Sequence, residues 1–350
     1  MASSKPRPPA RKVAVVGGGT AGLAAALALK RRGAEAIIVE SESAFGGKAS
    51  GYGCKGLGEC VRCDVCLAKN LVKDSINEEV VRYRNSHCVS LSGGPGDFEL
   101  TVDSSGRTER LQVAAVIVAT GSEAFDARLD KRLGAGAVPN VIPASEVESS
   151  LYRTGRLLTT DGVAPRSVAF VQCVGSRGPL GSGACSRVCC KYSLKMAQAL
   201  KRRYQDAAIT YFFMDWRPSD AQDDLRAWAE AQKGVRLIRS RPSEILSGED
   251  GSPLVRYASE DDASIVEHGF DIVVLSVGLV PSPNSAQVAN AFGLETDATG
   301  YIQIDERTSM TSRRGVFAAG CCTGPMDIRA SAEQGVAAAS AAVDLLEDVR

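Results

Sequence analysis

A glycine-rich turn near the N-terminus constrains the fold of this chain more than any other feature of its sequence. Residues 12–16 have the pattern of a strand, residues 21–32 that of an alanine- and leucine-rich helix, and residues 36–40 that of a second strand. Between the first strand and the helix stands Gly17-Gly18-Gly19-Thr20-Ala21-Gly22, a G-x-G-x-x-G pattern in the context that binds dinucleotides. The sequence therefore predicts a parallel βαβ unit with a dinucleotide at the start of its helix.

Each part of this turn has a physical role in the prediction. Gly17 permits the tight turn, Gly19 lets the backbone approach a pyrophosphate, and Gly22 lets the helix pack close to the sheet. The helix start at Thr20 and Ala21 supplies N–H donors and a partial positive charge. Glu40 ends the second strand, where a carboxylate accepts ribose hydroxyls and disfavours a 2′-phosphate. We therefore expect no NADP at this site.

The charge and hydropathy of the chain exclude some classes of partner and location. Acidic and basic residues number 41 each in the 350 residues, so nothing indicates nucleic acid or an anionic membrane as a partner. Apolar runs such as 113–119 and 272–277 have the length of a strand and are too short to form a transmembrane segment. The first twelve residues are polar and no apolar signal sequence follows them, so we expect a cytoplasmic protein.

Four segments carry weaker expectations of local structure. Residues 41–70 are rich in glycine and cysteine and predict a long functional loop. Residues 121–165 are expected to be a polar connector. Residues 111–118 have the pattern of one continuous strand, and residues 186–203 that of one helix.

Three short motifs make the chain resemble the flavoproteins with two dinucleotide-binding domains, the family of thioredoxin and glutathione reductases. They are Phe45-Gly46-Gly47-Lys48, Ala119-Thr120-Gly121 and the segment 315–320, which ends in Gly320 and precedes the last helix. The resemblance implies bound FAD, with the last segment touching its ribityl and pyrophosphate groups. That family usually has aspartate where this chain has Cys321, so the ribityl contact must be made differently, for example by backbone N–H groups.

The same resemblance implies the domain organisation. We predict an α/β fold with two Rossmann-like domains of the thioredoxin/glutathione reductase type, in which the FAD-binding domain is discontinuous. Residues 1–155 and 285–350 are assigned to the FAD-binding domain. Residues 156–284 are assigned to a second Rossmann-like domain.

A group of cysteines stands where the second domain should bind a nicotinamide nucleotide. Residues 167–172 predict a strand, but no second G-x-G-x-x-G follows it, and Cys173, Cys185, Cys189 and Cys190 occupy the neighbourhood. Eleven cysteines in a cytosolic chain with only two histidines indicate metal or redox ligands. Four thiolates suit a [4Fe–4S] cluster; zinc and buried structural cysteines are the alternatives. We also expect the helix N-terminus to favour the thiolate form of the adjacent pair.

This stretch also resembles the A subunit of heterodisulfide reductases, through Cys173, Gly175-Ser176-Arg177, Cys185-Ser186-Arg187-Val188-Cys189-Cys190 and Lys195, and through the tail 319–328. The resemblance implies FAD, a [4Fe–4S] cluster on those four cysteines, and a homodimer within a larger complex. It also implies that Lys195 approaches the flavin, the alternative being a solvated helix lysine. The chain lacks ferredoxin-like inserts, like the short bacterial members of sulfur-oxidising heterodisulfide-reductase-like complexes.

A second cysteine group has three interpretations. Cys54, Cys60, Cys63 and Cys66 lie at C-x₅-C-x₂-C-x₂-C spacing. They could bind a second cluster or labile metal, Cys60 and Cys63 could form a redox dithiol, or the thiols could serve only when a partner docks. Outside these groups, Cys88 is expected in a strand core, and Cys321 and Cys322 are expected to pack or to present N–H groups near the flavin phosphates.

These observations lead to one principal functional hypothesis and two alternatives. The principal one is an electron-transferring flavo-iron–sulfur subunit that passes electrons between FAD, a [4Fe–4S] cluster and the other subunits of a heterodisulfide-reductase-like complex in sulfur or thiol/disulfide metabolism. The first alternative is a self-contained NAD(P)H-dependent disulfide reductase that uses Cys60 and Cys63. The second is a non-catalytic assembly subunit with a structural cofactor.

Overall fold

The computed structural model of the protein describes residues 12–348 apart from 57–59, 79, 182 and 218–221. The chain divides into two compact units. The first comprises residues 1–51, 64–123 and 281–350, and the second comprises residues 52–63 and 124–280. No helix among the described residues combines the length and the apolar character needed to cross a membrane.

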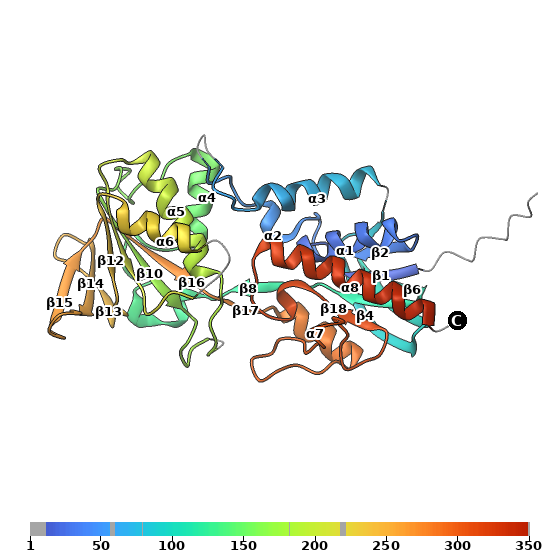
Figure 1. Ribbon diagram of the computed structural model, residues 1–350. Helices are drawn as coiled ribbons and strands as arrows, with labels where there is room; N and C mark the ends of the chain where they lie inside the picture. The colour runs from blue at the N-terminus through green and yellow to red at the C-terminus, as the bar shows by residue number, and fades with distance from the viewer. Residues whose placement is uncertain (1–11, 57–59, 79, 182, 218–221, 349–350) are drawn as a thin grey trace, which may run out of the picture. The chain divides into compact units, whose positions relative to one another are not determined.

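The first unit has three layers, and a parallel sheet forms the middle one (Figure 1). The strands β1 (Lys12–Val16), β2 (Glu35–Val39), β3 (Val81–Tyr83), β7 (Ala115–Val118) and β18 (Val316–Ala318) pair in the order β18-β7-β1-β2-β3. One face is covered by α1 (Thr20–Arg31), α3 (Val65–Asn77) and α8 (Ile328–Asp348). The other face is covered by the antiparallel strands β4 (Ser86–Gly94), β5 (Asp97–Ser104) and β6 (Arg107–Val113) and by α7 (Pro283–Phe292).

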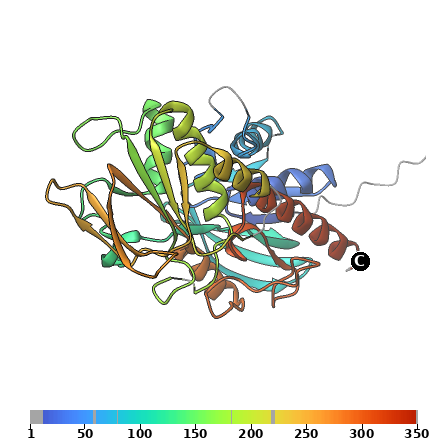
Figure 2. The same ribbon diagram turned by 60° about the vertical axis from the view of Figure 1, so that its left-hand side comes forward.

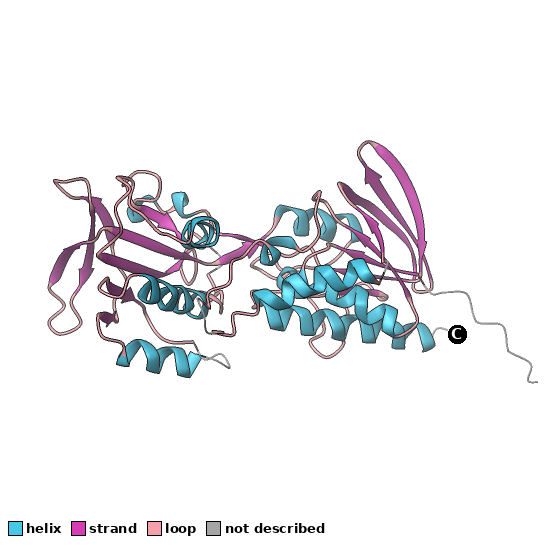
Figure 3. Cartoon of the chain, turned by 90° about the horizontal axis from the view of Figure 1, so that it is seen from above, coloured by secondary structure: helices cyan, strands magenta, loops and turns pink. Residues whose placement is uncertain are grey.

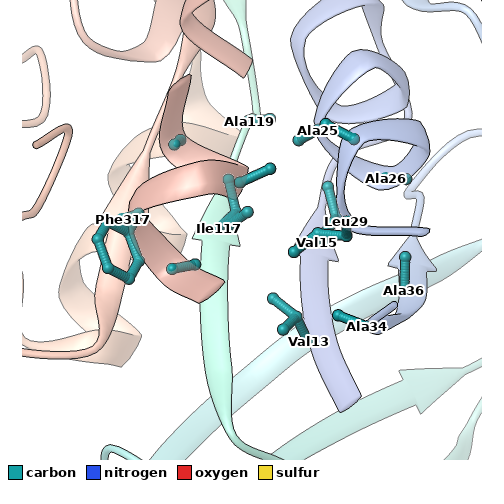
Figure 4. Packing of buried hydrophobic residues seen from close by; sticks show 14 of the residues in the cluster. Val13, Val15, Ala25, Ala26, Leu29, Ala34, Ala36, Ile117, Ala119 and Phe317 are labelled. Atoms are coloured by element: carbon teal, nitrogen blue, oxygen red, sulfur yellow. The ribbon is translucent and has the colours of Figure 1, made fainter. Parts of the chain in front are cut away.

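Small residues bring the helical layer close to this sheet. Figure 4 shows Val13, Val15 and Ile117 of the strands facing the alanines and Leu29 of α1. Helix α8 approaches α1 so closely that a Cβ on Gly335 would lie 2.2 Å from the carbonyl oxygen of Ala21. The alanine-rich composition of both helices is thus a packing requirement, because larger side chains would push the start of α1 away from the sheet.

The second unit repeats this layering (Figure 2). Its parallel sheet has the order β12-β11-β10-β16-β9, with β9 (Val141–Pro143), β10 (Ser167–Val174), β11 (Ala208–Phe212), β12 (Val235–Ile238) and β16 (Ile272–Val277). The helices α4 (Ala144–Thr154), α5 (Cys189–Arg203) and α6 (Gln222–Ala231) lie on one face. The antiparallel strands β13 (Glu244–Ser247), β14 (Pro253–Ala258) and β15 (Ile265–Gly269) lie on the other. Figure 3 separates the helical and strand layers by colour.

The structure places three segments differently from the sequence-based division. Residues 281–284 belong to the first unit. Residues 124–155 belong to the second unit because β9 pairs with β16 as an edge strand of its sheet. Residues 52–63 also belong to the second unit, through the contacts described below. Two of the connecting segments, β8 (Ser122–Ala124) and β17 (Leu279–Pro281), pair with each other as a two-stranded sheet.

Four local expectations are wrong in detail. The supposed loop 41–70 contains α2 (Gly47–Ser50) and the start of α3, and the supposed connector 121–165 contains β9 and α4. The expected strand 111–118 is two strands that part at Ala114, where the chain passes from the antiparallel sheet to the parallel one. Helix α5 begins at Cys189, three residues later than expected, because Arg187 has a left-handed backbone with φ of 59° that no α-helix accommodates.

Candidate functional site

The glycine turn between β1 and α1 is packed as tightly as its motif predicts. A Cβ on Gly17 would lie 2.4 Å from the carbonyl oxygen of Ala119, and Gly17 has φ of 106°. A Cβ on Gly22 would lie 1.9 Å from the carbonyl oxygen of Gly17. At Gly19 the space is open, since a Cβ there would meet only the Cα of Gly47, at 4.0 Å. The turn is therefore closed on its sheet side and open in front of the helix, which is the shape a pyrophosphate requires.

Glu40 is fixed beside this turn. Its side chain is buried, and Oε2 accepts a 2.7 Å hydrogen bond from the backbone N–H of Gly18. Its other oxygen, Oε1, accepts the N–H of Glu42 at 2.8 Å and the hydroxyl of Ser41 at 3.2 Å. The carboxylate thus stands at the end of β2 with its oxygens oriented by neighbouring groups, and Oε2 retains acceptor capacity for a hydroxyl.

The second and third predicted motifs meet the first one. The backbone N–H of Gly46 donates to the carbonyl oxygen of Gly18 at 2.8 Å, and Gly47 lies against Gly19. The Nζ of Lys48 donates to the carbonyl oxygen of Ser122 at 2.6 Å, next to the Ala119-Thr120-Gly121 segment. Three stretches that are distant in the sequence are therefore brought together around the start of α1.

The last segment completes this arrangement. Gly320 has φ of 78°, and a Cβ there would lie 2.6 Å from the Cβ of Ala21. Its N–H donates to Oε1 of Gln334 at 2.7 Å, so the N–H is held by α8. The thiol of Cys321 donates to the carbonyl oxygen of Met326 at 3.3 Å. No sequence motif marks Gln334, because only its position on α8 brings it to this segment.

A second contact missed by the sequence analysis fixes the Ala119-Thr120-Gly121 segment. The hydroxyls of Thr120 and Ser285 lie 2.7 Å apart, and the Ser285 hydroxyl also donates to the carbonyl oxygen of Gly121 at 3.1 Å. Ser285 belongs to α7 and is buried. No sequence motif marks it, since the contact joins residues 165 positions apart.

Cys322 gives a pH-dependent prediction for this unit. Burial raises the pKa of Cys322 to about 11, whereas a thiol in an unfolded chain ionises at about pH 8.5. Below that value the thiol is protonated in both states. Between it and about pH 11 only the unfolded state loses the proton, so each pH unit lowers the free energy of unfolding by up to about 1.4 kcal/mol. Urea unfolding across this window should show a steeper loss in the wild type than in Cys322→Ala; equal slopes would contradict the assignment.

The cluster cysteines, Cys173, Cys185, Cys189 and Cys190, come together at the end of β10. Three of them are buried and Cys185 is half-buried. The charges of Cys173, Cys185 and Cys190 each affect the pKa of Cys189, so all four thiols are electrostatic neighbours. Left-handed φ values of 61° at Cys173 and 59° at Arg187 fold the intervening chain back on itself.

The chemistry of this donor set matches the cysteine ligands of an iron–sulfur cluster. Among the described residues, no three histidine, cysteine, aspartate or glutamate side chains converge on a single metal position. A [4Fe–4S] cluster does not require such convergence, because each thiolate binds a different iron. Four neighbouring thiols from a strand end, a loop and a helix start fit that requirement.

The expectation that the helix field favours thiolates at the start of α5 is wrong for the protein without metal. Burial raises the pKa of Cys189 and of Cys173, and it raises that of Cys190 to about 11. Desolvation of the charged form therefore outweighs the helix N-terminus. Metal binding at these thiols would have to displace their protons.

Residues that follow β10 and β11 make contacts with each other. The first carboxylate after β11 is Asp215, three residues beyond the end of the strand. The guanidinium of Arg177 donates to both oxygens of Asp215, at 2.5 and 3.1 Å. In addition, a Cβ on Gly181 would lie 1.8 Å from the carbonyl oxygen of Gly175. The carboxylate and the glycines after β10 are thus used in internal contacts.

The cysteine loop, residues 52–63, is attached to the second unit by several contacts. Lys55 and Glu148 form a mostly buried ion pair at 2.8 Å, and the N–H of Gly53 donates to Glu148 at 3.0 Å. The Nζ of Lys195 donates to the carbonyl oxygen of Arg62, and Arg202 donates to that of Gly56 at 3.1 Å.

Lys195 is therefore a buried residue, and the alternative of a solvated helix lysine is wrong. Its contact with a flavin stays a prediction. Within the second cysteine group, Cys54 and Cys60 are exposed and Cys63 is half-buried in the cysteine loop, whereas Cys66 is exposed on α3 of the first unit. The choice among a second cluster, a dithiol and a docking site stays open.

We expect Lys195→Met to loosen the cysteine loop. Losing a hydrogen bond from a charged donor costs about 1.5–3 kcal/mol, so alkylation of Cys63 by iodoacetamide should become about tenfold faster or more, as measured by mass spectrometry. Lys201→Met is the matched control, because Lys201 lies on the same helix but donates to the carbonyl oxygens of Gln205 and Ala207. Lys195→Arg should restore slow alkylation. Equal rates in Lys195→Met and the wild type would show that the lysine does not hold the loop.

The family of this chain follows from the match of one protein-family model. The model of the pyridine nucleotide-disulphide oxidoreductase family matches residues 11–153 and 193–342. The chain belongs to this family. It is accordingly an oxidoreductase. The unmatched stretch, residues 154–192, contains β10 and all four cluster cysteines.

Curated relatives of this pyridine nucleotide-disulphide oxidoreductase are A subunits of heterodisulfide reductases. The A subunit of the ferredoxin/F(420)H(2)-dependent CoB-CoM heterodisulfide reductase of Methanosarcina acetivorans is 28 % identical over 96 % of this chain and 53 % of its own length. The iron-sulfur A subunit of the CoB–CoM heterodisulfide reductase of Methanocaldococcus jannaschii is 34 % identical over 73 % of this chain and 41 % of its own length. The chain thus spans about half the length of the first and less of the second.

Solved structures confirm the predicted fold class. Thioredoxin reductase of Lactococcus lactis matches 97 % of this chain and 99 % of its own, with a TM-score of 0.65 and 17 % identity. Thioredoxin reductase of T. acidophilum matches 97 % and 100 %, with a TM-score of 0.63 and 20 % identity. The chain therefore has two Rossmann-like domains of the thioredoxin reductase type.

Proposed function

We propose that this protein is an electron-transferring flavo-iron–sulfur subunit, with FAD in the first unit and a [4Fe–4S] cluster on Cys173, Cys185, Cys189 and Cys190 in the second. The observation that carries the proposal is that cysteines replace a nucleotide-binding turn at the end of β10. Four neighbouring thiols stand where a nucleotide-binding turn should be, and Arg177 occupies the carboxylate that a ribose would need.

The proposed FAD site is supported by the four segments around the start of α1. The open space before Gly19 accepts the pyrophosphate, and Glu40 accepts the ribose hydroxyls of the adenosine. The remaining contacts with FAD come from the other motif residues, which are Gly46, Gly47, Lys48, Thr120, Gly121, Gly320 and Cys321. When bound, FAD supplies an acceptor of two electrons, and the cluster supplies a centre that takes one.

The residues of the chain hold these centres and exclude competing chemistry. Asp215 is paired with Arg177, so its carboxylate is not free to accept the ribose hydroxyls of a nicotinamide nucleotide. Cys189 and Cys190 are buried, which shields a cluster from water. The likeness to heterodisulfide reductase subunits supports the further proposal that the protein exchanges electrons with partner subunits in sulfur or thiol/disulfide metabolism. We also propose that it is a cytoplasmic homodimer.

Iron and acid-labile sulfide analysis of the anaerobically purified protein tests the proposal. We expect about four iron atoms per FAD and an electron paramagnetic resonance signal after reduction with dithionite. About eight iron atoms would indicate that Cys54, Cys60, Cys63 and Cys66 bind a second cluster. Protein that carries FAD but no iron would contradict the proposal.

The same sample separates this function from a self-contained disulfide reductase. We expect the flavin absorbance to persist when NADH or NADPH is added, because the second unit lacks a nucleotide site, and to bleach with dithionite. Rapid bleaching by either nucleotide would instead support a reductase that uses Cys60 and Cys63. A flavin that dithionite cannot reduce would support a structural cofactor.

A further inference from the structure

The end of β10, which carries Cys173, departs from regular strand pairing. The register between β10 and β16 shifts by one residue between Val171 and Val174. Gln172 and Cys173 therefore stand opposite a single residue of β16, Ser276. This arrangement is a β-bulge, and Cys173 within it has a left-handed φ of 61°. Because a bulge re-aims the side chains of its strand, its shape determines where Cys173 points.

The side-chain amide of Gln172 joins this bulge to two other elements. Its Nε2 donates to the hydroxyl of Ser276 at 2.8 Å and to the hydroxyl of Ser193 at 2.9 Å. Ser276 lies on β16, and Ser193 lies on α5, one helical turn after Cys189. All three side chains of this network are buried. The amide therefore connects the strand end that carries Cys173 with the helix that begins at Cys189.

The hydroxyl of Ser193 is held in one orientation. It donates its single proton to the carbonyl oxygen of Cys189 at 2.6 Å, and the carbonyl oxygen of Cys190 lies farther away, at 3.3 Å. The hydroxyl of Tyr211, 2.7 Å from that of Ser193, must therefore be the donor of their hydrogen bond. With the amide of Gln172 as the other donor, Ser193 uses its proton and both of its lone pairs.

We propose that Gln172 and Ser193 are positioning residues for the cluster, because their hydrogen bond fixes the bulge of β10 against the start of α5. This inference rests on the proposed function, since it needs cluster ligands on both elements. Three of the four proposed ligands, Cys173, Cys189 and Cys190, lie on the two elements that this bond joins. A site keeps one geometry when hydrogen bonds lock the residues that support its ligands.

Release of iron from the anaerobically purified holoprotein to a ferrous chelator tests the inference. Gln172→Met and Ser193→Ala should each release iron about tenfold faster or more than the wild type, because their ligands are no longer held in one geometry. Gln198→Met is the matched control. Gln198 lies on α5 about two turns beyond the cysteines and, like Gln172, has a buried side-chain oxygen with no hydrogen-bond partner among the described residues. The control should release iron at the wild-type rate.

Two further measurements separate positioning from a general loss of stability. The g values of the dithionite-reduced cluster should change in Gln172→Met and Ser193→Ala, whereas a substitution that only weakens the fold leaves the spectrum of the bound cluster unchanged. The double variant should release iron more slowly than the product of the two single effects predicts, because the shared hydrogen bond can be lost only once. Single effects that multiply in the double variant would show that the residues act independently and would overturn the inference.

The iron content of each sample distinguishes the two proposals. A wild type without iron would overturn both the cluster and the role of the two residues. A wild type with about four iron atoms per FAD, whose release rate and spectrum are unchanged in Gln172→Met, would overturn the positioning role alone. If Gln172→Met fails to retain iron, Ser193→Ala decides: a wild-type release rate and spectrum in that variant would also overturn the role.

Discussion

Cys190→Ala is expected to abolish the iron content and paramagnetic signal of the protein while FAD stays bound. Cys190 is buried at the start of α5 in the second unit, whereas the residues proposed to hold the pyrophosphate and adenosine of FAD belong to the first. A [4Fe–4S] cluster that loses one of four thiolates loses a ligand that no nearby residue type replaces well. We expect iron and labile sulfide to fall at least tenfold, with an unchanged ratio of flavin to protein.

Cys88→Ala is the matched control for this experiment. Cys88 lies on β4 of the first unit, so Cys88→Ala makes the same change of side chain without touching the four cysteines of the second unit. The control should keep its iron. Iron retained in Cys190→Ala, or lost equally in both variants, would contradict the assignment of Cys190 as a ligand.

Gly22→Ala is expected to have the largest effect on the first unit. The added methyl group would lie 1.9 Å from the carbonyl oxygen of Gly17, a contact that only a backbone shift can relieve. Overpacking at such a site costs about 3 kcal/mol or more, and the shift would move the start of α1, where the pyrophosphate is proposed to bind. We expect loss of FAD on gel filtration and a lower midpoint of urea unfolding.

Gly94→Ala separates this steric effect from the general cost of replacing a glycine. Gly94 lies at the end of β4, and no atom lies within 4 Å of its added Cβ. This variant should keep FAD and nearly all of its stability. An FAD content in Gly22→Ala equal to that of the control would show that the turn does not need a glycine at this position.

The fold was predictable from the sequence because its signals are local. Each of these signals is one unbroken stretch of sequence. The strand Lys12–Val16 that precedes the glycine turn and the buried run Ile272–Val277 both have the bounds that their patterns predict. The start of α5 was not predictable, because an arginine at position 187 does not by itself indicate a left-handed backbone. The strand break at Ala114 likewise depends on two sheets that only the folded chain brings together.

The residues of the proposed sites fall into the same two groups, those that local sequence predicts and those whose contacts depend on the tertiary fold. The motif residues could be listed from the sequence, but the pairing of Arg177 with Asp215 joins residues 38 positions apart and follows from the tertiary fold. Burial is also a tertiary property, which is why the direction of the thiol pKa values at Cys189 and Cys190 differs from the expectation based on the helix start alone. The same holds for Lys195, whose partner comes from residue 62.

The attachment of the cysteine loop limits how this chain can be divided into fragments. Residues 124–280 are contiguous and contain the whole second sheet, yet a fragment with these bounds would leave out the loop that Glu148 and Lys195 contact. The mostly buried carboxylate of Glu148 would then lose its ammonium partner Lys55, which costs about 3–5 kcal/mol for a buried pair. The second unit is therefore not a transplantable module, and exchanging it between related proteins would require residues 52–63 to be transferred with it.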